Sequence, residues 1–314
     1  MKKFIIFSLF LFTNAFAVEG MPHSRIYHLE GTDFKYSKPE VFEFASTLPK
    51  NGWRFLDSSF SSQYLGAWGI IALSTGVMIV YDHQITKQTQ RLGRFLKLGN
   101  DESTKATFKV GGAALLRRPS DLSSTLYFIG DGWVTIGLMS GFFASGMIQD
   151  SPRSLQVSSQ LLQGLLLTGL TTQIIKRTTG RESPKVATKP GGRWKFFPST
   201  SKYQATTSSY DAFPSGHLAT TMTAFMIISE NFPEYTWIKP VGATAMALLS
   251  FQMVNNSVHW ASDYPLALGI GYMIGKTIVD NGRQKVDDPN QTQSYFSPFL
   301  DDSGKFGLAW NVNY

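Results

Sequence analysis

One histidine of the chain stands in a setting that suits chemistry on phosphate. His217 follows the turn Pro214-Ser215-Gly216 and opens an apolar run. Ser215 is a typical helix N-cap residue, and Gly216 lets a ligand approach the backbone closely. The free N–H groups at a helix start attract anions, phosphate above all. An imidazole at this place could donate a proton to a leaving group, so the turn is a moderately specific candidate for a phosphate site.

A second histidine has a carboxylate partner. His259 precedes Asp263 by four residues, so the two side chains share one face if the segment is helical. A carboxylate beside an imidazole fixes its tautomer, orients the ring and stabilises a positive charge on it. His259 is therefore a candidate nucleophile toward phosphorus that would form a phosphohistidine. Two other interpretations stay open: such a pair is usually structural, and histidines ligate metals where a further ligand lies nearby.

Cations for a phosphate come from a basic segment at residues 176–184. It contains Lys176, Arg177 and Arg181 and follows a long apolar run. Positive side chains at a helix end can stabilise the charge on phosphoryl oxygens. Taken alone, they can equally be explained by the negative end of the helix dipole.

The order of the three motifs carries a family resemblance. Lys176 to Pro184, then Phe-Pro-Ser-Gly-His at 213–217, then His-Trp-Ala-Ser-Asp at 259–263 resembles the type-2 phosphatidic acid phosphatase superfamily. This family includes lipid phosphatases, bacterial nonspecific acid phosphatases and vanadium haloperoxidases, and the likeness covers roughly residues 126–279. It implies a helical bundle whose motifs meet at one end and hydrolysis without a metal or other cofactor. The resemblance also implies roles for individual residues. His259 would be the nucleophile, Asp263 its orienting carboxylate and His217 the general acid. The phosphate ligands would be Lys176, Ser215 and Gly216.

Two departures from the family pattern concern arginines. Ser183 stands where the first motif usually has arginine, and Gln252-Met253 stands where the third usually has Ser-Arg. Each lost charge-assisted hydrogen bond removes about 1.5–3 kcal/mol. We expect Arg181, and to a lesser extent Arg177, to compensate only in part in phosphate binding, so that the activity is reduced or directed at a different substrate. The alternative is a degenerate, non-catalytic member that binds phosphate or lipid; a haloperoxidase fits less well, because tight vanadate binding needs the missing arginines.

Helices are expected to position these motifs. The 314-residue chain is 43% hydrophobic and 16% charged, which is typical of a helix-rich protein. We predict an all-α fold, a bundle of about six core helices with the motifs converging at one end, plus a small C-terminal β-hairpin or extended tail. The tail alternates from Phe306 to Tyr314 in a strand pattern. The apolar runs that predict the helices are 65–81, 132–148, 155–175, 217–229, 241–254 and 264–279.

The N-terminus predicts export. Two lysines, an apolar run and Ala15-Phe16-Ala17 make residues 1–17 a signal peptide. The remaining divisions that we predict are an exported lead-in with short helices at 18–63, a phosphatase-like helical domain at 64–280 and a tail at 281–314. We expect a periplasmic or membrane-associated protein whose site faces the periplasm.

Charge and cysteine content restrict the partners. The net charge of +7 is not gathered in Lys/Arg blocks, which favours a phosphorylated small molecule or lipid as the partner over nucleic acid. The chain has no cysteine, which excludes disulfides, thiol catalysis and cysteine-bound zinc. The expected activity is that of a phosphatase acting on a phosphomonoester or a lipid (di)phosphate.

Overall fold

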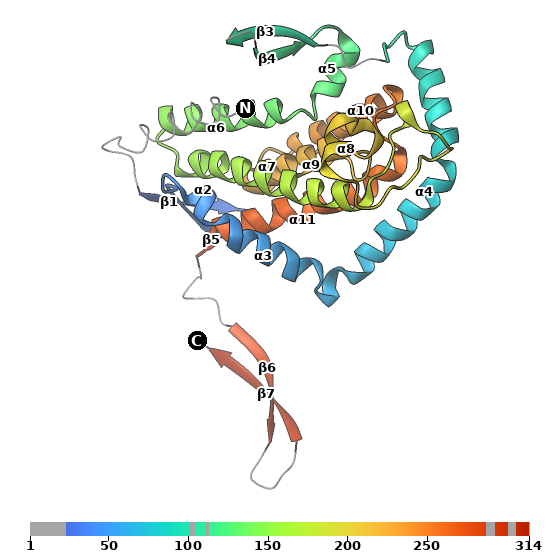
Figure 1. The fold of residues 1–314 in the computed structure, drawn as a ribbon. Helices are drawn as coiled ribbons and strands as arrows, with labels where there is room; N and C mark the ends of the chain where they lie inside the picture. Colours follow the sequence, from blue (N-terminus) through green and yellow to red (C-terminus); the bar gives the residue numbers. More distant parts are fainter. Residues whose placement is uncertain (1–22, 101–103, 111–112, 287–292, 301–305, 314) are drawn as a thin grey trace.

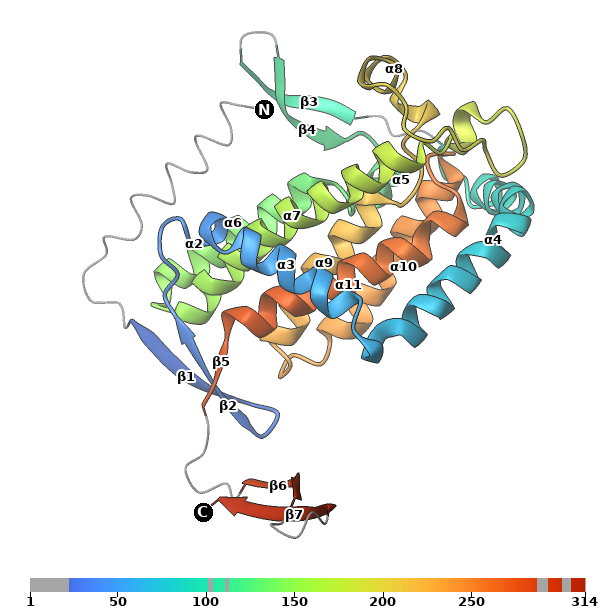
Figure 2. The same ribbon diagram turned by 60° about the horizontal axis from the view of Figure 1, so that its bottom comes forward.

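Three helices lie side by side in the middle of the fold (Figures 1 and 2): α7 (Pro152–Thr179), α9 (Gly216–Asn231) and α11 (Tyr264–Gly282). The computed structural model describes residues 23–100, 104–110, 113–286, 293–300 and 306–313. Four further helices flank the central three: α6 (Gly132–Ile148) packs on α7, α10 (Ile238–Asn255) on α9, and α3 (Leu48–Ser59) and α4 (Ser62–Phe95) on α11. The predicted all-α bundle is confirmed.

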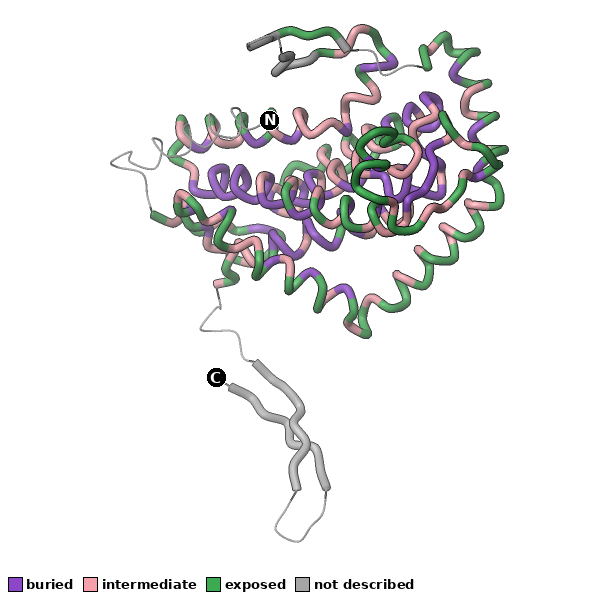
Figure 3. The backbone as a smooth tube through the Cα atoms, in the orientation of Figure 1, coloured by how far each residue is buried: buried purple, intermediate pink, exposed green. Residues whose placement is uncertain are grey.

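Small residues let the central helices approach closely. A side chain at Gly271 or Gly275 of α11 would collide with the backbone and side chains of α9, including the carbonyl of Ala219. The apolar core follows this contact, and Ile227 and Ile274 are fully buried within it. Figure 3 shows that burial concentrates on the three central helices and falls off toward α4. Apolar burial between these helices is therefore the main stabilising contribution to the bundle.

Short elements connect the helices and close the ends of the bundle. The antiparallel strands β1 (Ser24–Leu29) and β2 (Thr32–Ser37) form a sheet with β5 (Gln284–Lys285). Two hairpins are separate from it: β3 (Thr104–Val110) with β4 (Ala113–Pro119), and β6 (Gln293–Leu300) with β7 (Phe306–Asn313). The short helices are α2 (Glu43–Ser46), α5 (Leu122–Phe128), α8 (Thr200–Ala205), η1 (Pro184–Val186), η2 (Thr207–Ser209) and η3 (Ala261–Asp263).

Several sequence predictions can be compared with these elements. The C-terminal hairpin is confirmed by β6 and β7, although its turn at 301–305 and Tyr314 lie outside the described residues. The lead-in is predicted to hold short helices; in addition it holds the β1–β2 hairpin, whose strand β2 pairs with β5 far along the chain. The run 65–81 continues through residues 82–95 as one helix, α4. The signal peptide lies outside the described residues, and the domain boundaries stay a prediction.

One helix in the described part of the chain could reach across a membrane by length and composition. This is α4, whose most apolar window has a mean hydropathy of 1.6 and is 0% buried within the protein. Helices α5 and α6, which meet at a bend of 67°, pass the same test only as a pair. The length and exposed apolar surface of α4 support contact with a membrane, whereas export rests on residues that the structure does not describe.

Candidate active site

Backbone hydrogen bonds hold the three motif loops together at one end of the bundle. Helix α7 is capped at its C-terminus by Gly180, whose φ of 54° is left-handed and favours glycine. Beyond it, the N–H of Ala212 donates to the carbonyl of Arg181 at 3.0 Å. The N–H of Ser215 donates to the carbonyl of Asp263 at 3.1 Å. The first motif is thereby bonded to the residues just before the second, and the second is bonded to the third.

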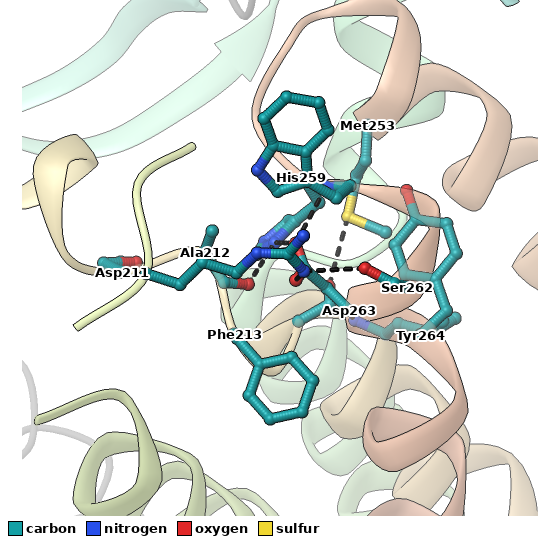
Figure 4. Close-up of polar contacts among 12 residues, drawn as sticks. Asp211, Ala212, Phe213, Met253, His259, Ser262, Asp263 and Tyr264 are labelled. Carbon is teal, nitrogen blue, oxygen red and sulfur yellow. Dashed lines mark hydrogen bonds and ion pairs between the residues drawn. The ribbon is translucent and has the colours of Figure 1, made fainter. Parts of the chain in front are cut away.

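His259 is held in one tautomer by two acceptors. Its Nδ1 lies 2.7 Å from the carbonyl oxygen of Ala212 and 3.3 Å from Oδ2 of Asp263 (Figure 4). Neither oxygen can donate a hydrogen bond if Asp263 is ionised, so Nδ1 must carry the hydrogen. The lone pair is then on Nε2, which is the atom that a nucleophilic histidine uses. The ring is buried, at 2% exposed, so only a substrate that enters the site reaches it.

The His259–Asp263 pair forms without the helical segment that the spacing suggested. The residues between them make a turn of 3₁₀ helix, η3, and α11 begins only at Tyr264. Asp263 Oδ2 also accepts from the N–H of Trp260 at 2.8 Å, which closes this turn. The contact predicted for the two side chains is thus present, but the geometry that produces it differs.

His217 faces His259 across the site. The two ring centroids are 6.4 Å apart and the rings are inclined at 70°. On its other side His217 packs against Tyr127, with centroids 4.8 Å apart. Burial, together with the charges of His259 and Lys176, lowers the pKa of His217 to about 3. With this pKa, His217 is neutral at pH 7.

The predicted phosphate ligands gather beside the two histidines. Ser215 is the N-cap of α9 and accepts from the N–H of Leu218 at 3.3 Å. Lys176 Nζ lies 3.8 Å from the point where a Cβ on Gly216 would stand, and it pairs with Asp211 Oδ1 at 3.0 Å. The structure therefore brings one cation and one helix start together next to His217.

Arg181 is not among the phosphate ligands beside His217, because its side chain is bonded to groups of the protein. Its side chain is fully buried, and its five N–H groups donate within the protein. The acceptors are Asp82 Oδ2 at 2.7 Å, Asp263 Oδ1 at 2.5 Å, Ser262 Oγ at 2.7 Å and the Gly191 carbonyl at 2.8 and 3.2 Å. Its guanidinium carbon also lies 4.9 Å from the ring centroid of Trp194 and 5.6 Å from that of Trp260. A phosphate would have to displace these partners, so the predicted phosphate-binding role of Arg181 does not fit this arrangement.

Two neutral side chains, Gln252 and Met253, stand where the third motif of the family usually has Ser-Arg. Met253 is buried, and its sulfur lies 3.4 Å from Oγ of Ser215. Gln252 donates to the carbonyl of Gly99 at 3.0 Å and to Asn256 at 2.6 Å. Arg177, the other expected substitute, is exposed, with its guanidinium 4.3 Å from the ring centroid of Tyr203.

Sequence reasoning missed one charged residue, Asp82 of α4. Its carboxylate is fully buried and accepts from Arg181 and Ser262. The only local signal is that Asp82 ends a long uncharged run, which does not reveal the partner. Among the described residues, no group of three or more His, Cys, Asp or Glu side chains could hold a metal ion.

Fold and site together define an all-α protein with a histidine-centred site at one end of its bundle. Residues 159–285 match the sequence model of the PAP2 superfamily, and this stretch contains every residue predicted for the site. Over these residues the chain is therefore similar to the PAP2 superfamily. Members of this family are in general phosphatases that act on phosphorylated small molecules or lipids. Comparison with curated proteins and with solved structures gives no match.

Proposed function

We propose that the protein is a phosphatase that hydrolyses a phosphomonoester or a lipid (di)phosphate through a phosphohistidine at His259. One observation carries this proposal: two acceptors hold Nδ1 of His259, so that Nε2 carries the lone pair when the ring is neutral. A second imidazole, His217, stands 6.4 Å away between ring centroids, close enough to act on the same phosphoryl group.

In the first step, Nε2 of His259 forms a bond to phosphorus while the bond from phosphorus to the leaving oxygen breaks. Protonated His217 gives its proton to that oxygen, and Asp263 stabilises the positive imidazole. Lys176 and the N–H groups at the start of α9 stabilise the phosphoryl oxygens. In the second step, a water oxygen forms a bond to phosphorus while the bond from phosphorus to Nε2 of His259 breaks; His217 takes a proton from the water, and inorganic phosphate leaves.

An apolar cavity favours a substrate with a hydrocarbon part. A cavity of about 460 Å³ lies among α6, α9 and α10. It includes Thr221, one helical turn beyond His217, and its walls are otherwise almost entirely apolar. Its lining includes Leu138, Phe225, Trp237 and Val241. We accordingly favour a lipid phosphate, met by an exported, membrane-associated enzyme whose site faces the periplasm.

The test is release of inorganic phosphate by the purified full chain from a chromogenic phosphomonoester and from a long-chain lipid phosphate. We expect vanadate-sensitive turnover, and His259→Gln should lower kcat by about 1,000-fold or more. His28→Gln is the matched control, because His28 is exposed and pairs with Asp33 away from the motifs. The phosphohistidine is not expected to survive in acid, so labelled phosphate should be recovered on the protein when the reaction is stopped at alkaline pH. Equal activity of wild type and His259→Gln would rule out the mechanism.

A second candidate is a non-catalytic member of the family that binds phosphate or lipid. It is favoured by the neutral Met253 and Ser183 and by the internal partners of Arg181. For a non-catalytic member we expect saturable binding of phosphate or vanadate and no release of phosphate from either substrate. The same assay therefore separates the two candidates.

A further inference from the structure

Asp82 connects a helix outside the family-matched segment to the candidate catalytic pair. It lies on α4, well before residue 159, where the match begins. Its Oδ2 accepts from Arg181 Nη2 at 2.7 Å and from Ser262 Oγ at 2.6 Å. Its Oδ1 accepts from the N–H of Ser262 at 3.0 Å. Ser262 directly precedes Asp263, so Asp82 fixes the turn that carries the orienting carboxylate.

The charges in this cluster are unequal. The guanidinium of Arg181 lies between two carboxylates, Asp82 at 2.7 Å and Asp263 at 2.5 Å, and all three side chains are fully buried. One positive charge thus faces two negative charges in a region of low dielectric. The excess negative charge suits a histidine that becomes positive when it attacks phosphorus.

We propose that Asp82 is a positioning residue for the His259–Asp263 pair, an inference that rests on the proposed function. By engaging Arg181, Asp82 prevents the guanidinium from neutralising Asp263 alone, so Asp263 keeps negative charge for the imidazole. By bonding Ser262, it also holds Asp263 at the place where Oδ2 reaches His259 Nδ1. Asp82 itself does not touch the substrate, because its carboxylate is enclosed by Arg181 and Ser262.

Asp82→Asn tests this role, since asparagine keeps the size of the side chain and removes its charge. We expect kcat to fall by about 10- to 100-fold, as for a small misplacement of reacting groups. KM and the Kd for vanadate should stay within about twofold, because Lys176 and Ser215 are not partners of Asp82. The ring ¹⁵N signals of His259 should also shift in NMR spectra. The matched control is Thr86→Val on the same helix, since the buried Thr86 hydroxyl makes no hydrogen bond in the described part of the chain.

The outcomes separate this inference from the proposed function. A folded Asp82→Asn variant with wild-type kcat and unchanged His259 signals would overturn the positioning role of Asp82. A Thr86→Val variant whose kcat falls as much as that of Asp82→Asn would overturn it too. If the wild type releases no phosphate, the proposed function fails, and the His259 signals alone decide the positioning role. If Asp82→Asn does not fold, Ser262→Ala decides, because it removes the two hydrogen bonds of the Ser262 hydroxyl, to Asp82 and from Arg181, and leaves all charges in place. Its kcat should fall by about three- to tenfold, and an unchanged kcat and spectrum would overturn the inference.

Discussion

At the scale of single residues, the protonation of His217 decides whether the site can work as an acid catalyst. Burial and the neighbouring His259 and Lys176 lower the pKa of His217 to about 3. Neutral His217 cannot donate a proton, so the free protein loses its acid catalyst as the pH rises above that value. A bound phosphate carries negative charge and favours the protonated imidazole, which raises the pKa again in the complex.

The resulting prediction concerns two pH profiles. The value of kcat/KM reports the free protein and should fall steadily from pH 4 to pH 7, whereas the fall in kcat should lie at higher pH. Steady-state kinetics with one phosphomonoester across this range measure both. His217→Asn should lower kcat and abolish the fall in both parameters with rising pH. Any fall that remains in this variant belongs to the ionisation of the substrate. If kcat and kcat/KM fall over the same pH range, His217 is not the acid catalyst.

At the scale of elements, local sequence signals predicted the helices well and the partners of Arg181 poorly. The start of α9 was predictable because Ser215 caps a run of helical period, and the structure shows that cap. The role of Arg181 was not, because Asp82 lies 99 residues away on a helix with no motif of its own. The pairing of β2 with β5 was missed for a similar reason, since β5 comes just after α11, about 250 residues farther along the chain. Spacing along the chain reveals local structure and leaves contacts between distant elements undetermined.

The loop that follows α7 gives a prediction for stability. Burial raises the pKa of Glu182, but hydrogen bonds from Lys195 and from the N–H groups of Thr188 and Arg193 outweigh it and lower the pKa to about 2. A folded pKa below the unfolded value means that the stabilisation is full above about pH 4.5 and is lost as the pH falls toward 2. It amounts to roughly 3 kcal/mol.

Glu182→Gln should therefore lower the free energy of unfolding at pH 7 and change it little at pH 2.5. Urea unfolding followed by circular dichroism at both pH values measures the difference. Glu43→Gln serves as the control, because burial raises the pKa of that carboxyl and the sign of its contribution is opposite. A Glu182→Gln variant that is destabilised equally at both pH values would show that the loop depends on shape and not on charge.

At the scale of the whole molecule, α4 has two different halves. The uncharged half, residues 62–81, is about 30 Å long as a helix, which equals the thickness of a bilayer core. Ile70, Leu73, Val77 and Val80 are between 50% and 78% exposed, and their spacing puts them on one face. The second half begins at Asp82 and contacts η3 and α10. The same helix thus offers apolar residues outward and supplies a carboxylate to the site.

This division predicts that α4 attaches the protein to a membrane and that the attachment can be separated from the site. Replacing Leu73, Val77 and Val80 by Gln removes apolar surface that the protein leaves exposed, so folding should be little affected. Binding to lipid vesicles should weaken by at least tenfold, because each buried apolar side chain contributes about 1.5–3 kcal/mol. Vesicle flotation of the full chain measures this, with Phe42→Gln, a change at another exposed apolar residue, as the control.

Turnover of a water-soluble phosphoester should persist in the triple variant, since those residues lie before Asp82 and outside the hydrogen-bonded cluster of Asp82, Arg181 and Asp263. If the variant floats as the wild type does, α4 is not the attachment, and the apolar face must be covered in another way.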